Sequence, residues 1–156
     1  MYTFLLSEGL PVEESELRKL EKSFKFSFPK ILRELWLKHN GARIQEMHLI
    51  IEGDEFDVVR FLDVDMLKML LNEAKTHGEL IEYIPFAEDW GGDLFCWKVD
   101  DGGVYILYPD SDVPIMLTES IEQFFTMMEE HVQTESMFST IRKDADELLK
   151  EIIGKD

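Results

Sequence analysis

The segment Ile84–Leu107, with the sequence IPFAEDWGGDLFCWKVDDGGVYIL, decides the fold that we expect for this chain. It contains two apolar, aromatic-rich runs that flank the tetrad Asp100–Gly103. The sequence Asp-Asp-Gly-Gly is typical of a tight hairpin connection, because these residues accept positive φ. A second turn is expected at Trp90–Gly92, after a shorter apolar run. The pattern predicts a meander of three antiparallel strands, rich in aromatic residues, at Tyr83–Ala87, Asp93–Val99 and Val104–Tyr108.

Two helices are expected before this meander. The first opens within Pro11–Glu16, where proline suits a first helical turn and glutamates complement the helix dipole. Its apolar stripe contains Leu17, Leu20 and Phe24. The second is expected to start at Pro29, with Ile31, Leu32, Leu35 and Trp36 facing inward, and to end at Asn40–Gly41.

Shorter elements are expected between these helices and the meander. Strands are predicted at Met47–Ile51 and Asp57–Leu62, joined through Glu52–Phe56, and a helix is predicted at Val64–Lys75. His77–Gly78 is expected to close that helix.

The end of the chain is expected to hold one more strand and two helices. The strand is predicted at Ile115–Leu117, and Thr118 is placed to cap the helix that follows. A polar break is expected at His131–Ser136, before a last helix from about Ser139 to Ile153. The sequence therefore predicts a single α+β domain over residues 1–156, with a mostly antiparallel twisted sheet flanked by helices and an extra C-terminal helix within 132–156.

Charge is distributed unevenly along the chain, whose net charge is −17. Between Thr76 and Ile141 one base, Lys98, stands against 14 acids, whereas Leu17–Arg43 holds eight bases against two acids. Such acidity serves either solubility or attraction of a basic partner, and it disfavours nucleic acid. The basic helical part could also dock on the acidic part of a second copy, giving a homodimer.

Catalytic and cofactor motifs are not apparent in the sequence. The Gly pairs lie in expected hairpin turns, so no phosphate-binding loop is predicted, and the four histidines have no partners at metal-ligand spacing. The lone cysteine, Cys96, lies within an expected strand and is interpreted as a buried thiol. We therefore expect no enzyme activity, cofactor or metal. Without a leader or an apolar run long enough to span a bilayer, the chain is expected to be cytoplasmic.

Carboxylates at the meander turns are the strongest candidates for a site. The preferred explanation of these carboxylates is turn chemistry and solvation. Partner binding is the second explanation, and catalysis or metal binding is the third. Trp90, beside a Gly pair, is either a partner anchor or a core residue. The candidate partner-binding residues are Glu88, Asp89, Trp90, Asp93, Asp101, Asp110 and Asp112.

Two segments and a helix near the end of the chain resemble the SUKH superfamily, which includes cell-wall-assembly regulators and many bacterial immunity proteins. Phe28–Gly41, FPKILRELWLKHNG, is similar to its element of a proline, a helix and Asn-Gly, although Ala42 replaces a frequent second glycine. Ile84–Ala87, Gly92–Trp97 and Gly103–Tyr105 resemble its central motif, and the helix with Ile121, Phe124 and Phe125 resembles its final helix. The resemblance covers about residues 13–128.

This resemblance implies a non-enzymatic binding domain. Bacterial members of this length typically bind and neutralise a cognate polymorphic toxin, often a nuclease, and the acidic stretch could act there as a phosphate mimic. The alternative is a regulatory or scaffold protein of the cell-wall-assembly type. An enzyme that uses the turn carboxylates is the third possibility.

Overall fold

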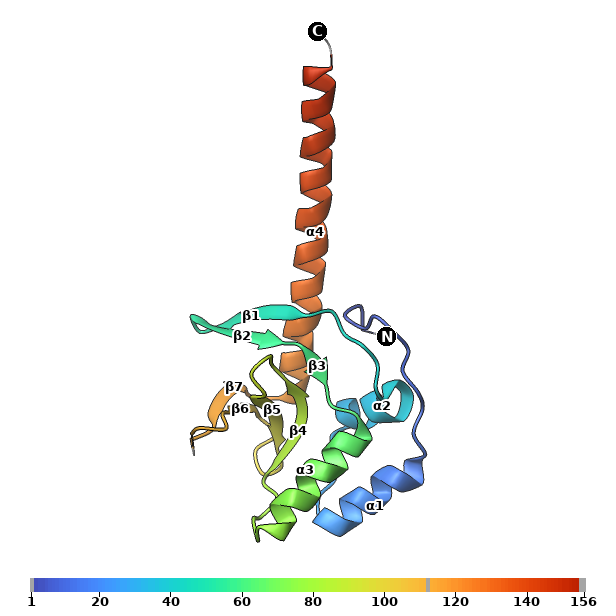
Figure 1. Cartoon of the computed structure of the whole chain (residues 1–156), viewed down its shortest axis with the longest axis vertical. Helices are drawn as coiled ribbons and strands as arrows, with labels where there is room; N and C mark the ends of the chain where they lie inside the picture. The colour runs from blue at the N-terminus through green and yellow to red at the C-terminus, as the bar shows by residue number, and fades with distance from the viewer. Residues whose placement is uncertain (1, 112, 155–156) are drawn as a thin grey trace.

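The computed structural model describes residues 2–111 and 113–154, which form an α+β fold (Figure 1). Within these residues there are four helices and seven strands in two antiparallel sheets. The helices are α1 (Glu14–Phe24), α2 (Lys30–His39), α3 (Val64–Thr76) and α4 (Ile121–Ile153). The strands are β1 (Met47–Ile51), β2 (Asp54–Val58), β3 (Arg60–Phe61), β4 (Tyr83–Glu88), β5 (Leu94–Lys98), β6 (Val104–Leu107) and β7 (Ile115–Thr118).

The central sheet has the strand order β3-β4-β5-β6-β7, so the predicted meander is confirmed. Its strands carry fully buried side chains toward the helices, among them Ile84, Phe95 and Ile106. Phe86 lies at a register shift in β4, and its ring contacts Phe124 of α4 edge-on. The sheet and the first part of α4 thus share one aromatic core.

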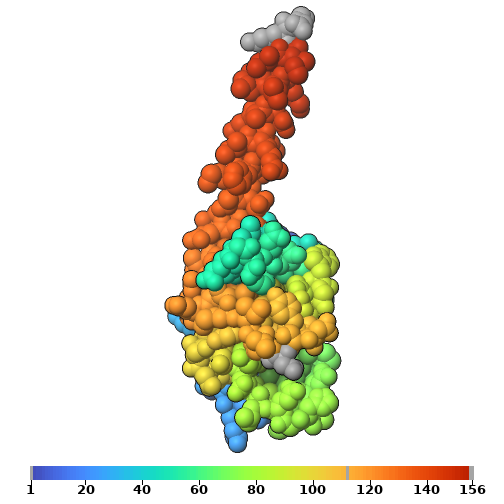
Figure 2. Space-filling view, turned by 90° about the vertical axis from the view of Figure 1, so that its left-hand side faces the viewer, coloured from blue at the N-terminus to red at the C-terminus, as the bar shows by residue number. Residues whose placement is uncertain are grey.

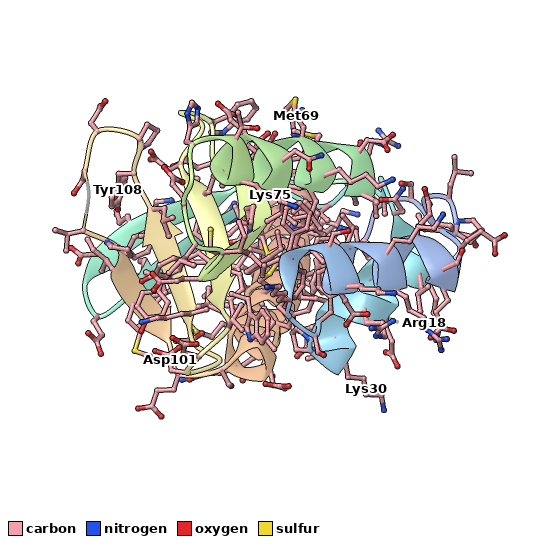
Figure 3. The ribbon with its side chains drawn as sticks, turned by 90° about the horizontal axis from the view of Figure 1, so that it is seen from below. Arg18, Lys30, Met69, Lys75, Asp101 and Tyr108 are labelled. Carbon is pink, nitrogen blue, oxygen red and sulfur yellow. The ribbon has the colours of Figure 1, made fainter. Side chains whose placement is uncertain are left out.

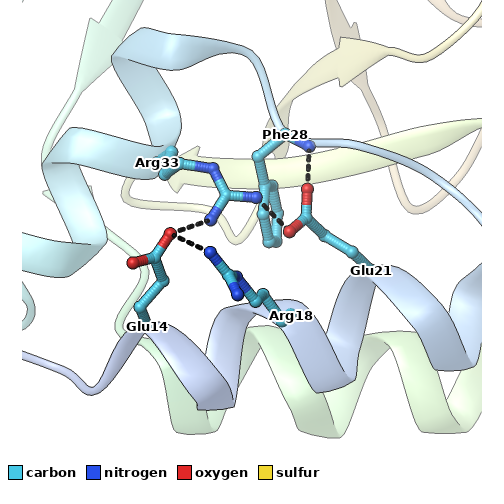
Figure 4. A network of polar contacts seen from close by, with 5 residues as sticks. All are labelled: Glu14, Arg18, Glu21, Phe28 and Arg33. Atoms are coloured by element: carbon cyan, nitrogen blue, oxygen red, sulfur yellow. Dashed lines mark hydrogen bonds and ion pairs between the residues drawn. The ribbon is translucent and has the colours of Figure 1, made fainter.

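The helical hairpin α1–α2 is held by a polar network between its helices (Figure 4). The Glu21 carboxylate accepts a hydrogen bond from the Phe28 backbone N–H at 2.9 Å and pairs with the Arg33 guanidinium. A second nitrogen of Arg33 lies 3.7 Å from Glu14. The hairpin attaches to the rest of the fold through Trp36, whose indole N–H donates to the Leu62 carbonyl at 2.9 Å.

The predicted strand Asp57–Leu62 is wrong in its bounds, because this part of the chain is divided between the two sheets. Glu52 and Gly53 both have positive φ and make a two-residue turn, so β2 begins at Asp54 rather than Asp57. The chain then leaves β1 at Val58, and β3 pairs with β4 instead.

The predicted break at His131–Ser136 is also wrong, because α4 runs without interruption from Ile121 to Ile153. Five of the six residues are polar, and the segment includes neither Gly nor Pro, so nothing in it stops a helix. Ser120 rather than Thr118 caps α4, and its hydroxyl accepts from the Gln123 N–H at 3.1 Å. Similarly, Pro29 is the N-cap of α2 rather than its first residue.

Candidate partner-binding surface

The β4–β5 turn forms the centre of the candidate surface. One carboxylate oxygen of Asp89 accepts hydrogen bonds from the backbone N–H groups of Gly91 and Asp93, each at 2.9 Å. Gly92 has φ of +84°, which its lack of a side chain permits. The tight turn holds Trp90 outward with 71% of its surface exposed, so this residue is not part of the core.

Four acids gather near this turn, from three different parts of the chain. Burial, a hydrogen bond to Asp89 and the charges of Asp89 and Asp110 together raise the pKa of Asp93 to about 6. Burial raises the pKa of Tyr108, and the charges of Asp93, Asp89 and Asp54 raise it further. Asp89 and Asp110 thus act on Asp93, and Asp54, Asp89 and Asp93 act on Tyr108, so these four acids, here called the acidic cluster, share one electrostatic environment.

A groove of about 880 Å³ borders the turn. Trp90, Glu88 and Asp89 line it from the sheet, and Arg43 faces it from the loop after α2. Arg60 also lines this groove and pairs with Glu88, its cross-strand neighbour. Because Glu88 is only 14% exposed and already paired, it contributes less free negative charge than the sequence suggested.

The structure separates Asp101 from the acidic cluster. Asp101 lies in the β5–β6 turn, at the opposite end of β5, and Figure 3 shows it far from Tyr108. Its carboxylate accepts from the Tyr105 hydroxyl at 2.6 Å and from the Gly103 N–H at 2.8 Å. The Tyr105 hydrogen bond lowers the pKa of Asp101 and raises the pKa of Tyr105 to about 12. Asp101 thus stabilises its own turn, and Asp112 lies outside the described residues.

Sequence reasoning missed the basic residues of this surface. Arg43 and Arg60 were not singled out, and neither lies in a motif. The pairing of Arg60 with Glu88 depends on the register of β3 against β4. Only the opposite charges of Arg60, in one predicted strand, and of Glu88, directly after another, could have suggested this pairing.

The remaining reactive side chains do not assemble a catalytic set in the part of the chain that the structure describes. Cys96 is buried, as expected, and burial raises the pKa of its thiol. His48 lies on β1 with Nδ1 2.7 Å from Asp57, and hydrogen bonds to Asp57 and Glu55 raise its pKa. No group of three or more His, Cys, Asp or Glu side chains within residues 2–111 and 113–154 could hold a metal ion. The described helices include none with the length and apolar character needed to span a bilayer.

The fold and this surface define a small α+β domain that presents an exposed tryptophan next to acidic residues at the edge of a mixed-charge groove. The chain belongs to the SMI1 / KNR4 family (SUKH-1), whose model matches residues 11–127. The resemblance found in the sequence is thereby confirmed. No curated protein gives a match. Family membership supports a broad immunity or regulatory role, and SUKH members are generally non-enzymatic.

Proposed function

We propose that this chain is a cytoplasmic immunity protein that binds a cognate bacterial toxin through Trp90 and the acidic cluster. The observation that carries the proposal is the 71% exposure of Trp90, which lies in the same turn as Asp89 and Asp93 of the acidic cluster. An exposed tryptophan offers a large contact area and is a common anchor of protein interfaces. The partner that fits this chemistry has a basic surface with an apolar recess.

The electrostatics of the cluster favour such a partner. The pKa of Asp93 is raised partly by the charges of Asp89 and Asp110, so ionised carboxylates repel one another there. Lysine or arginine side chains of a partner would relieve this repulsion on binding. A nuclease must hold phosphate groups with cationic residues, and clustered carboxylates can occupy the same residues. The acidic field would also speed encounter at low salt.

The alternative is a regulatory protein of the cell-wall-assembly type. Family membership supports the regulatory role and the immunity role equally. The exposed surface of Trp90 and acidic residues favours the immunity role, because it suits the binding of one basic protein. The two functions differ in their partners, so identification of the partner separates them.

The test is a growth-rescue assay with the protein encoded immediately upstream of this chain. That protein is expressed in a host with the wild-type chain, with Trp90→Ala/Asp110→Lys, or with Asp100→Lys. Asp100 is an exposed acid of the distant β5–β6 turn, so its reversal controls for charge alone. We expect the wild type and the control to restore growth. The double variant should bind at least about 30-fold more weakly, because anchor residues contribute about 2 kcal/mol or more.

Binding is then measured on the purified pair across salt concentrations. Affinity that falls with salt for the wild type, and less steeply for the double variant, would support the electrostatic mechanism. Rescue that is equal for all three chains would keep the immunity role and refute this surface. An upstream protein that is harmless and does not bind, together with recovery of several envelope proteins, would favour the regulatory role.

A further inference from the structure

The C-terminal part of α4 has no contact partner within the described chain. Ile121, Phe124, Phe125 and Met128 are buried against the body, but every residue from Gln133 to Gly154 is exposed. Figures 1 and 2 show this part of α4 standing away from the body. At 1.5 Å per residue, the projecting segment, residues 133–153, is about 30 Å long.

The projecting segment carries an apolar stripe along one side. Its large apolar side chains are between 52% and 71% exposed: Met137, Phe138, Ile141, Leu148, Leu149, Ile152 and Ile153. At about 100° per residue they fall within an arc of roughly 160°, and charged residues such as Lys143 and Glu147 lie opposite. Phe138, Ile141, Ala145, Leu148 and Ile152 follow one another at alternating steps of three and four, which is the spacing of a coiled-coil seam.

The body of the same chain does not cover this stripe. On the same helical wheel, the buried residues of the first half of α4 are centred roughly 120° away from the stripe. The stripe is therefore not a continuation of the face that packs on the sheet. A straight helix would have to break to bring the stripe onto the body, and no Gly or Pro lies between Ile121 and Ile153 to permit that.

Charge disfavours a membrane surface as the occupant. Helices that lie on membranes are rich in Lys and Arg and bind anionic lipid. Residues 133–154 hold three bases, Arg142, Lys143 and Lys150, against five acids, and the whole chain carries −17. An anionic lipid surface would repel this protein.

We propose that the stripe packs against the same stripe of a second copy, so that two α4 helices form a coiled-coil dimer. Homodimers with two-fold symmetry need one self-complementary surface, and an apolar heptad seam is self-complementary. Seven apolar side chains at roughly 100 Å² each would bury on the order of 700 Å² per chain. Standard specific interfaces bury about 600–1,000 Å² per partner, so this area lies within the range that a dimer needs.

Sedimentation equilibrium of the full chain, over low to high micromolar concentrations, tests this proposal. The wild-type mass should move from 18.3 kDa toward twice that value as concentration rises. Ile141→Asp/Leu148→Asp should remain monomeric throughout. Ser139→Asp/Thr140→Asp adds the same charge off the stripe and should dimerise like the wild type. Near-UV circular dichroism checks that the body is intact, which we expect because both substituted positions on the stripe lie outside it.

Salt distinguishes this dimer from one held by charge. A dimer held by the apolar stripe should persist at roughly 0.5 M NaCl, where the Debye length is only a few ångströms. Docking of the basic α1–α2 hairpin on the acidic part of a second copy would dissociate instead. The proposal is overturned if the wild type stays monomeric at every concentration, or if the stripe variant dimerises as well as the control.

Discussion

Replacement of Trp36 by phenylalanine should destabilise the fold by about 3 kcal/mol. Trp36 is 1% exposed, and its indole N–H donates to the Leu62 carbonyl at 2.9 Å. Phenylalanine removes the donor and leaves a buried carbonyl unpaired, which costs about 1–3 kcal/mol. The smaller ring also leaves a gap beside Phe28, whose ring centroid lies 5.1 Å away, and that gap adds about 1 kcal/mol.

Urea unfolding, followed by far-UV circular dichroism, measures this loss. The midpoint should fall without a change in slope, because the surface exposed on unfolding stays almost the same. In a thermal scan, about 3 kcal/mol corresponds to a decrease in Tm of roughly 6–12 °C for a chain of this size.

Trp90→Phe is the matched control, because it makes the same substitution at a tryptophan that is 71% exposed. It should change the free energy of unfolding by less than about 0.5 kcal/mol. The assignment of Trp36 to the core and Trp90 to the surface is refuted if Trp36→Phe is as stable as the wild type, or if both variants lose equal stability.

Two further predictions concern a close backbone contact and the acidic cluster. Gly9→Ala should cost about 2–4 kcal/mol, because the added Cβ would lie 2.6 Å from the Asn40 carbonyl oxygen at a φ of +70°. Gly78→Ala, with a φ of +72° and open space, should cost only about 1 kcal/mol in the same urea assay, and equal losses would contradict this reading. The pKa of Asp93 is about 6 in the folded protein, against 3.8 for an ordinary aspartate. The folded state therefore binds this proton more tightly than the unfolded state, and the free energy of unfolding falls as pH rises between these two values. Asp93→Asn should therefore be more stable than the wild type by up to about 1 kcal/mol at pH 7.5, a value that allows for solvent screening of this partly exposed group. The stability of the variant should also depend less on pH between about 4 and 6. If the variant shows the same pH dependence as the wild type, ionisation of Asp93 is not the source of that dependence.

Much of the fold was predictable because its signals are local. The Asp-Asp-Gly-Gly turn and the aromatic runs around it specify β5 and β6, since turn sterics and side-chain burial act over a few residues. The amphipathic pattern of α1 is a local signal in the same sense. So is Gly41, which has φ of +74° and lies just after the end of α2. Where the local signal was only polarity, as at His131–Ser136, the prediction of a break was wrong.

The candidate site depended on information that no local pattern contains. The sequence determined that acids and a tryptophan would lie in the meander turns, because the Asp and Gly residues around them favour tight turns. Only the tertiary structure decided which turns meet: alternate hairpin turns lie at opposite ends of an antiparallel sheet, so Asp110 joins Asp93 whereas Asp101 does not. The pairing of Arg60 with Glu88 likewise follows from the register of two strands far apart in the chain. Proximity between distant residues is set by strand order and packing, and these are properties of the whole fold.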